Sequence, residues 1–174
     1  MTEKEKVMTW LAENGFEPEI HEHPATPTVE SAKQYWAELD GVQHSKNLFL
    51  RNHKGNRHYL LIADCDRPLD LRRLAAVIGD TRLSFGSEER LMKYLGVRPG
   101  SVSLFSLLND ETGAVTLLLD AKLLEAPKLS FHPNDNTASL VITQADLRRF
   151  LSLRNIPYRP IPFPAVSTEN QLSW

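Results

Sequence analysis

The segment Gln43-His44-Ser45-Lys46-Asn47-Leu48-Phe49-Leu50 decides how the rest of the chain is interpreted. Four polar residues stand directly before an apolar run, and a short apolar run bounded by turn residues is typical of a buried strand. We therefore expect a strand from Asn47 to Arg51, with Lys46 at its mouth. Two later segments are its expected partners in a site, because each combines turn residues with polar side chains. They are Pro99–Ser103 and Phe131–Ala138.

Length and composition indicate an ordinary globular domain. The chain has 174 residues, 41% of them hydrophobic and 24% charged, which is enough for one self-sufficient core. No apolar run approaches the roughly 20 residues that span a bilayer, and the N-terminus lacks a secretory pattern. Cys65 is the single cysteine, so an intrachain disulfide is impossible and a reducing cytoplasm is the expected location.

The charge balance limits the nucleic acids that the protein can bind. A net charge of −2 argues against broad, sequence-independent binding, which needs many phosphate contacts, and against DNA as a partner. A short single-stranded end requires only a local cluster of cations. The residues that could supply one are Lys46, Arg51, Lys54 and Arg57.

Helices and strands alternate without a regular βαβ rhythm. Capping residues and glycine stops predict helices over 2–15, 28–39, 70–78, 88–95 and 143–153, and 120–125 is expected to form a helical turn. Strands are predicted over 47–51, 58–64, 82–85, 115–119, 128–131 and 139–142. Residues 16–23 are expected to be extended, and 97–110 to form a loop and a strand. The fold class is therefore α+β, with a mixed, mostly antiparallel sheet and flanking helices.

The C-terminal region is rich in proline. Residues 156–164 contain four prolines and are predicted to form an extended arm on the surface. We expect one domain over 1–164, followed by a tail over 165–174.

Most familiar catalytic patterns are absent from the sequence. There is no GxSxG elbow, Walker loop or GxGxxG fingerprint, so serine hydrolysis, nucleotide hydrolysis and dinucleotide binding have no support. His21 and His23 are two apart on an expected strand, but surface histidines are the commoner interpretation and no metal is expected. Asp64 and Asp66 flank Cys65 and are expected to raise the pKa of its thiol, which predicts an inert cysteine.

Several segments in a fixed order resemble the YbaK/ProX family, whose members are free-standing relatives of the editing domain inserted in bacterial prolyl-tRNA synthetase. The similarity is greatest to the ProX branch and covers roughly residues 5 to 155, and motif order with spacing is more specific than any single motif. The segments that carry it are His44–Leu50, Leu83–Phe85, Glu89–Val97, Pro99–Ser103 with Asn109-Asp110, and Phe131-His132-Pro133 with Asn136-Thr137-Ala138.

The resemblance implies an α+β domain that hydrolyses mischarged tRNA, mainly Ala-tRNA(Pro), in trans and without a cofactor. A lysine of the family, which Lys46 matches by position, is thought to hold the phosphate backbone of the tRNA 3′ end. The family often has Gly-Ser-Val-Ser-Pro where this chain has Leu104 as the fifth residue, which leaves the stiffness of that loop open. The resemblance implies catalytic roles for Lys46, Gly100 and Ser101, and substrate-binding roles for Asn47, Val102, Leu104, His132 and Asn136.

The residue inventory is consistent with hydrolysis of an activated ester. A positioned water can suffice for such an ester, with backbone N–H groups of the Gly100 loop stabilising the oxyanion. The expected partners are the 3′ acceptor end of a mischarged tRNA and prolyl-tRNA synthetase. The alternative is a non-catalytic module that binds tRNA or the synthetase and has lost turnover. The removed amino acid stays open among alanine, serine and cysteine.

Overall fold

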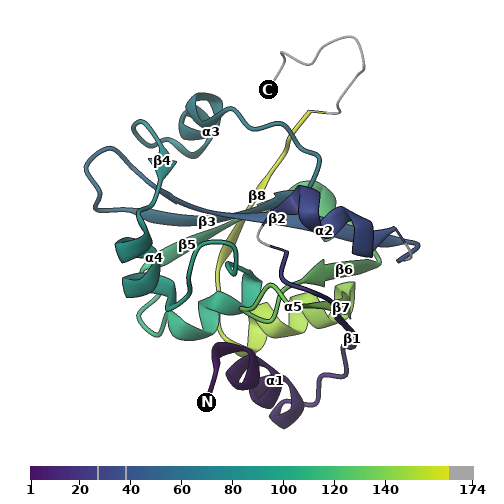
Figure 1. The fold of residues 1–174 in the computed structure, drawn as a ribbon. Helices are drawn as coiled ribbons and strands as arrows, with labels where there is room; N and C mark the ends of the chain where they lie inside the picture. The colour runs from purple at the N-terminus through teal and green to yellow at the C-terminus, as the bar shows by residue number, and fades with distance from the viewer. Residues whose placement is uncertain (27, 38, 165–174) are drawn as a thin grey trace.

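The computed structural model of the protein describes residues 1–26, 28–37 and 39–164. These residues form one eight-stranded sheet with helices on both faces (Figure 1). The α-helices are α1 (Glu3–Glu13), α2 (Val29–Trp36), α3 (Leu71–Ile78), α4 (Glu88–Leu95) and α5 (Gln144–Leu153), and two 3₁₀ helices are η1 (Leu104–Asn109) and η2 (Ala121–Leu124). The strands are β1 (Glu19–Glu22), β2 (Val42–Arg51), β3 (His58–Asp64), β4 (Ser84–Phe85), β5 (Val115–Asp120), β6 (Lys128–Phe131), β7 (Ala138–Thr143) and β8 (Tyr158–Ile161). The α+β class is confirmed.

The sheet is mixed, in the order β1-β7-β6-β2-β3-β5-β8, with β4 paired to β2 beside this path. The strands predicted over 47–51 and 58–64 are confirmed, and they form a hairpin, because β2 and β3 pair antiparallel from Ser45 opposite Asp64 to Arg51 opposite His58. On its other edge β2 pairs with β6 only at residues 42–44 and with β4 only at residues 50–51. Between these two short pairings, the edge of β2 therefore has no neighbouring strand among residues 1–26, 28–37 and 39–164.

Local sequence signals account for the helix ends. Thr2 and Glu5 form a capping box at the start of α1, within the helix predicted over 2–15. The side chain of Asp70 accepts hydrogen bonds from two backbone N–H groups at the start of α3, and such caps satisfy donors that have no partner within the helix. Gly79 ends α3 with φ 72°, a left-handed conformation that glycine adopts without steric cost.

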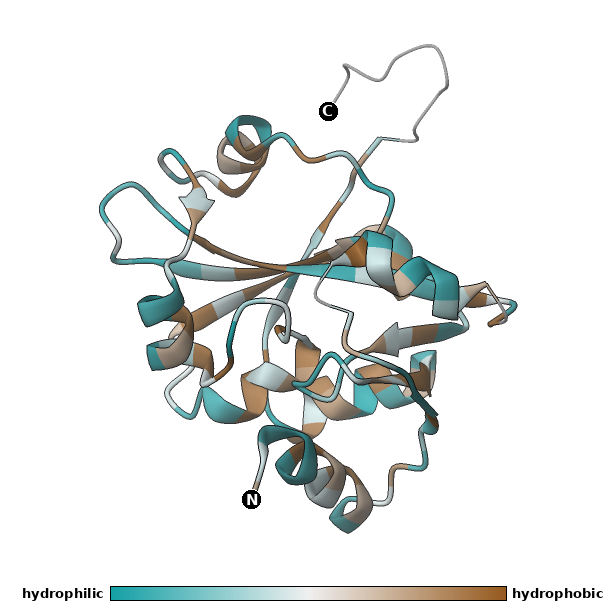
Figure 2. Ribbon diagram, viewed as in Figure 1, coloured by the Kyte–Doolittle hydropathy of each residue, from teal (hydrophilic) through white to brown (hydrophobic). Residues whose placement is uncertain are grey.

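Apolar residues are divided between the two faces of the sheet. Figure 2 shows them concentrated along the central strands and on the helix sides that face the sheet. The larger cluster includes Phe105 and Phe150 and joins α1, α4, η1 and α5 to one face. The smaller cluster, around Leu50 and Leu74, lies under α3 on the other face. Since β3 is buried along its whole length, the hairpin is covered on both faces and holds the neighbouring residues of β2 rigidly.

Three predicted elements need correction. Lys46 is not at the mouth of a strand, because β2 begins at Val42 and Lys46 lies inside it, opposite Ala63. Residues 97–110 contain the 3₁₀ helix η1 and no strand. The proline-rich arm is not a free surface arm, because residues 158–161 form β8 parallel to β5 and Ile161 is fully buried. The predicted tail, residues 165–174, lies outside the described residues.

Candidate functional site

A cleft of about 250 Å³ opens at the unpaired part of the β2 edge. Three segments that are far apart in the sequence meet there, namely the middle of β2, the turn at Gly100 and the loop after β6. Helix α2 and the loop before it complete the walls. The lining residues are Thr26, Thr28, Val29, Ala32, Trp36, Ser45, Lys46, Asn47, Leu48, Gly100, Val102 and His132.

Lys46 is the one cation among the residues that line this cleft. Its Nζ donates a hydrogen bond to the backbone carbonyl of Arg67. Burial lowers the pKa of the Lys46 ammonium, while Cys65, Asp64 and Asp66 act in the opposite direction. An ammonium has three N–H donors, so two remain for a bound group after the bond to Arg67.

The carbonyl that holds Lys46 belongs to a firmly fixed residue. Arg67 is buried and donates to both carboxylate oxygens of Asp120, at 3.1 and 3.3 Å, and to the Pro164 carbonyl at 2.9 Å. Its guanidinium carbon also lies 5.0 Å from the centre of the Phe163 ring. Because a buried ion pair needs accurate geometry to offset the loss of hydration, Arg67 has little freedom to move. Lys46 is thereby positioned by the arm that follows β8.

Polar atoms at the cleft wall remain unpaired within the described part of the chain. The buried Oδ1 of Asn47 and Nε1 of Trp36 have no hydrogen-bond partner there. His44 does not line the cleft but stacks on Trp36 at 4.2 Å, and neither of its ring nitrogens has a partner among the described residues. Burial lowers the pKa of His44 to about 4. Unpaired buried polar groups are costly, so this wall is suited to a ligand that supplies the missing bonds.

The Gly100 segment enters the cleft as a tight turn. The Ser101 N–H donates to the Arg98 carbonyl at 3.1 Å, and Gly100 has φ 84°. Proline at the second position and a left-handed glycine at the third are the signature of a type II turn. Gly100 and Val102 both line the cleft, and their N–H groups have no hydrogen-bond partner among the described residues.

His132 has a defined tautomer. Its Nδ1 lies 3.0 Å from the Ala138 carbonyl, and a carbonyl only accepts, so Nδ1 carries the proton and Nε2 has a free lone pair. Burial lowers the pKa of His132, and the His23 ring, 6.4 Å away, acts in the same direction. His132 is therefore a neutral hydrogen-bond acceptor at neutral pH.

Five of the residues expected in the site line the cleft together: Lys46, Asn47, Gly100, Val102 and His132. The other three do not line it. Ser101 lies in the turn, but its N–H is used within the turn. Leu104 is fully buried at the first position of η1 and belongs to the larger core cluster, so it forms no wall of the cleft. The Asn136 carbonyl instead accepts from the backbone N–H and hydroxyl of Thr26, which fixes a residue of the wall.

The α2 side of the cleft was not anticipated as part of the site. The sequence predicted a helix over 28–39, and the Thr28 hydroxyl caps α2 by accepting from Ser31 N–H. Val29, Ala32 and Trp36 lie at i, i+3 and i+7, a spacing that is typical of a helix face packed on the core. Only the unpaired Trp36 Nε1 distinguishes this face from an ordinary core face.

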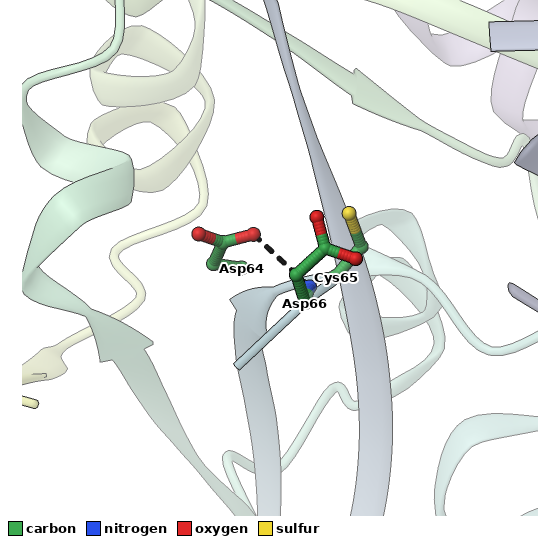
Figure 3. A group of neighbouring side chains, drawn as sticks. All are labelled: Asp64, Cys65 and Asp66. Carbon is green, nitrogen blue, oxygen red and sulfur yellow. Dashed lines mark hydrogen bonds between the residues drawn. The ribbon is translucent and has the colours of Figure 1, made fainter. Parts of the chain in front are cut away.

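Beside the cleft, Asp64, Cys65 and Asp66 place their ligand atoms within 4.8 Å of one another. Figure 3 shows the Asp64 carboxylate accepting from the Asp66 backbone N–H. The ammonium of Lys122 donates to the other Asp64 oxygen, so this carboxylate is occupied. The predicted rise in the Cys65 pKa is confirmed, to about 11, with burial as the largest cause and the two aspartates next. Of the two histidines considered as metal ligands, His23 instead contacts the Ser139 hydroxyl at 3.0 Å.

Residues 23–150 match the model of the aminoacyl-tRNA editing domain family. The chain belongs to this family, as the sequence motifs predicted, and its class of activity is that of an aminoacyl-tRNA deacylase.

Relatives of this chain match over nearly its whole length. It is 38% identical to the prolyl-tRNA editing protein ProX of Acetoanaerobium sticklandii, over 92% of this chain and 98% of that protein. It is 35% identical to prolyl-tRNA synthetase associated domain-containing protein 1 of Danio rerio, over 85% and 80%. A crystal structure assigned provisionally as a trans-editing enzyme for prolyl-tRNA synthetase superposes with a TM-score of 0.68 at 22% identity, over 94% of this chain and 99% of that one. None of the described helices is long and apolar enough to cross a membrane.

Proposed function

We propose that the protein hydrolyses mischarged tRNA in trans and that its principal substrate is Ala-tRNA(Pro). The observation that carries this proposal is the cleft at the open edge of β2, where Lys46, Asn47, Gly100, Val102 and His132 come together. The relatives named for prolyl-tRNA editing support the choice of tRNA. The prolyl-tRNA synthetase partner and the cytoplasmic location stay predictions.

In the proposed reaction the cleft positions the ester and the protein supplies no nucleophile. Lys46 binds a phosphate of the tRNA 3′ end through the two N–H donors that the Arg67 carbonyl leaves free. Water attacks the ester carbonyl carbon, the bond from that carbon to the ribose oxygen breaks, and a proton passes to the ribose oxygen. The neighbouring ribose hydroxyl assists the water. The N–H groups of Gly100 and Val102 stabilise the oxyanion, and His132 accepts a hydrogen bond at Nε2.

Selectivity for alanine follows from the different tasks of two pockets. A site built for proline admits alanine, since each missing methylene costs only about 1–3 kcal/mol of discrimination. An editing pocket must instead exclude the larger proline ring, and overpacking a close-packed wall is costly. Val102 and His132 are the wall residues suited to this. Leu104, which was expected to bind substrate, lies in the core and contributes nothing to this wall.

A deacylation panel tests the proposal under single-turnover conditions. The tRNA(Pro) is charged with alanine, serine, cysteine or proline, and the wild-type protein is compared with Val102→Ala. We expect the alanyl ester to be cleaved far faster than the prolyl ester, and Val102→Ala to raise the prolyl rate. Equal alanyl and prolyl rates in the wild type would rule out a size-selective pocket. Binding of charged tRNA without turnover would favour the non-catalytic alternative.

A further inference from the structure

A group of cations surrounds His58 at the far end of the β2–β3 hairpin. The Arg90 guanidinium lies 3.0 Å from His58 Nε2 and donates to the Gly55 carbonyl. Arg51 is the cross-strand partner of His58. Burial lowers the pKa of His58, and the charges of Arg90, Arg51 and Lys93 lower it further. The Lys93 ammonium lies 5.2 Å from the centre of the Tyr94 ring, which is 4.1 Å from the His58 ring. Three cations thus lie close to one neutral imidazole, and we call Arg51, Arg90 and Lys93 the hairpin-end cluster.

The hairpin-end cluster has no anion of its own. Other surface cations form ion pairs, such as Lys4 with Glu22 and Lys128 with Glu19. Among the described residues, no carboxylate lies within 4.0 Å of a charged nitrogen of the cluster, although two glutamates precede Arg90 in the first turn of α4. The buried Nε of Arg51 has no hydrogen-bond partner there either. Uncompensated like charges raise the local potential and attract an anionic ligand.

This cluster lies on the same face of β2 as part of the cleft. Side chains alternate along a strand, so Asn47, Phe49 and Arg51 point to one face. The rise of about 3.3 Å per residue places Arg51 roughly 13 Å along β2 from Asn47. Figure 1 shows α4 beneath this end of the hairpin, and the chain leaves α4 directly for the turn at Gly100. The exposed Arg98 begins that turn, so cations extend from the cluster towards the cleft.

We propose that the hairpin-end cluster, with Arg98, binds phosphates of the acceptor strand of the tRNA whose 3′ end lies in the cleft. This inference rests on the proposed function, since the cleft fixes where the strand begins. A phosphodiester backbone fits better than an acidic protein surface, because a row of cations leading out of a cleft matches a chain of evenly spaced charges.

The test compares two double variants of equal charge. Arg51→Gln with Lys93→Gln removes two cluster cations and keeps Arg90, whose bond to the Gly55 carbonyl supports the hairpin. Arg72→Gln with Arg73→Gln is the control, on α3 across the sheet, where the Arg73 ion pair is exposed. A charge-retaining variant, Arg51→Lys with Lys93→Arg, tests for rescue. Thermal unfolding checks that all three are folded.

Three measurements are made on each variant. Two lost phosphate contacts lower the slope of log affinity against log salt by about 1.4, equivalent to roughly 10- to 30-fold weaker binding at 0.1 M salt. For full-length Ala-tRNA(Pro) we expect KM to rise by that factor in the cluster variant, with kcat unchanged. The alanyl ester of adenosine, which has no phosphate, should be cleaved at the wild-type rate. Binding of deacylated tRNA, followed by fluorescence anisotropy against salt, should show the same loss of slope without any turnover.

The outcomes separate this inference from the proposed function. One possible result is that neither the wild-type protein nor any variant deacylates tRNA, while the cluster variant alone loses affinity for tRNA and part of the slope of log affinity against log salt. The cluster would then bind RNA, and the editing role would be wrong. If the cluster and control variants keep the same KM, affinity and salt slope, the inference is overturned. That result would point to an acidic protein partner for the cluster. Weak binding by the charge-retaining variant, equal to that of the cluster variant, would also count against the inference.

Discussion

Two groups of polar residues in this molecule differ in whether their side chains have hydrogen-bond partners. Below η1, Asn134 Oδ1 accepts from Ser103 and Ser106 hydroxyls at 3.0 and 2.9 Å, and its Nδ2 donates to Glu3. At the cleft wall, Asn47 Oδ1 and Trp36 Nε1 have no partner among the described residues. The first group is complete without a ligand, and the second is not. The contrast separates polar residues that hold the fold from those available to substrate.

The largest expected effect is on the free energy of unfolding, and it comes from changing Asn134 in the first group. Asn134→Ala leaves two buried hydroxyls without their acceptor, and unpaired buried polar groups cost about 1–3 kcal/mol each. The left-handed φ of 57° at this position adds strain for alanine. We expect a loss of about 2–4 kcal/mol in urea unfolding. Asn134→Gly, which accepts the backbone conformation, should recover part of it.

The matched change at the cleft wall is Asn47→Ala. Its side-chain oxygen has no partner to lose, so the free energy of unfolding should change by less than about 1 kcal/mol, while kcat/KM for Ala-tRNA(Pro) falls. Equal destabilisation by Asn47→Ala and Asn134→Ala would remove the distinction between the two groups.

Lys46→Ala should give the next largest effect, on activity alone. A charge-assisted contact to phosphate contributes about 1.5–3 kcal/mol, which corresponds to a roughly 10- to 150-fold lower deacylation rate. Because burial lowers the pKa of Lys46, wild-type activity should fall with rising pH before an ordinary lysine would lose its proton. Lys46→Arg, which keeps the charge, should move that alkaline limb upward. A folded Lys46→Ala protein with the wild-type rate would exclude Lys46 from the site.

The lowered pKa of His44 predicts a smaller effect on stability, which depends on pH. Its pKa of about 4 in the folded protein lies below the ordinary 6.5, so the unfolded chain binds a proton first as pH falls. Stability is then fully present above about pH 6.5 and is lost between pH 6.5 and 4. Allowing for partial exposure, we expect a loss of about 1–2 kcal/mol from this residue. His44→Phe keeps a ring against Trp36 and should unfold in urea with less dependence on pH over this window.

The smallest expected effect compares two glycines with left-handed backbones. Gly100 has φ 84° and Gly113 has φ 68°, so alanine at either position should cost about 1 kcal/mol of stability. Only Gly100 lines the cleft, so only Gly100→Ala should also slow deacylation. Loss of activity in Gly113→Ala would show that the Gly100 result reflects general destabilisation.

The sequence predicts the parts of this fold that depend on neighbouring residues. Caps such as Thr2 and Asp70 define helix ends through bonds within a few residues. The extension of β2 back to Val42 depends instead on β6, more than eighty residues later, and polar residues such as His44 gave no sign of it. Likewise Ile161 is buried only because β8 joins β5, whereas the surrounding prolines indicated an exposed arm.

The site was predicted in part, for a similar reason. Lys46, Gly100 and His132 lie in motifs with a recognisable order, and the structure brings them to one cleft. The same resemblance placed Leu104 beside them, but its side chain turns into the core at the start of η1. Trp36 was missed because an aromatic residue on a helix face normally indicates core packing. Motif position thus predicted the backbone path better than the direction of each side chain.

The contacts of Arg67 have a consequence for synthesis on the ribosome. A protein emerges from its N-terminus at about 5–20 residues per second, and its earlier parts fold first. Arg67 binds Asp120, the Phe163 ring and the Pro164 carbonyl, and its own carbonyl binds Lys46. Of the residues that the structure describes, Phe163 and Pro164 are among the last to emerge. The set of contacts that positions Lys46 is therefore complete only when nearly all of the described residues have been made.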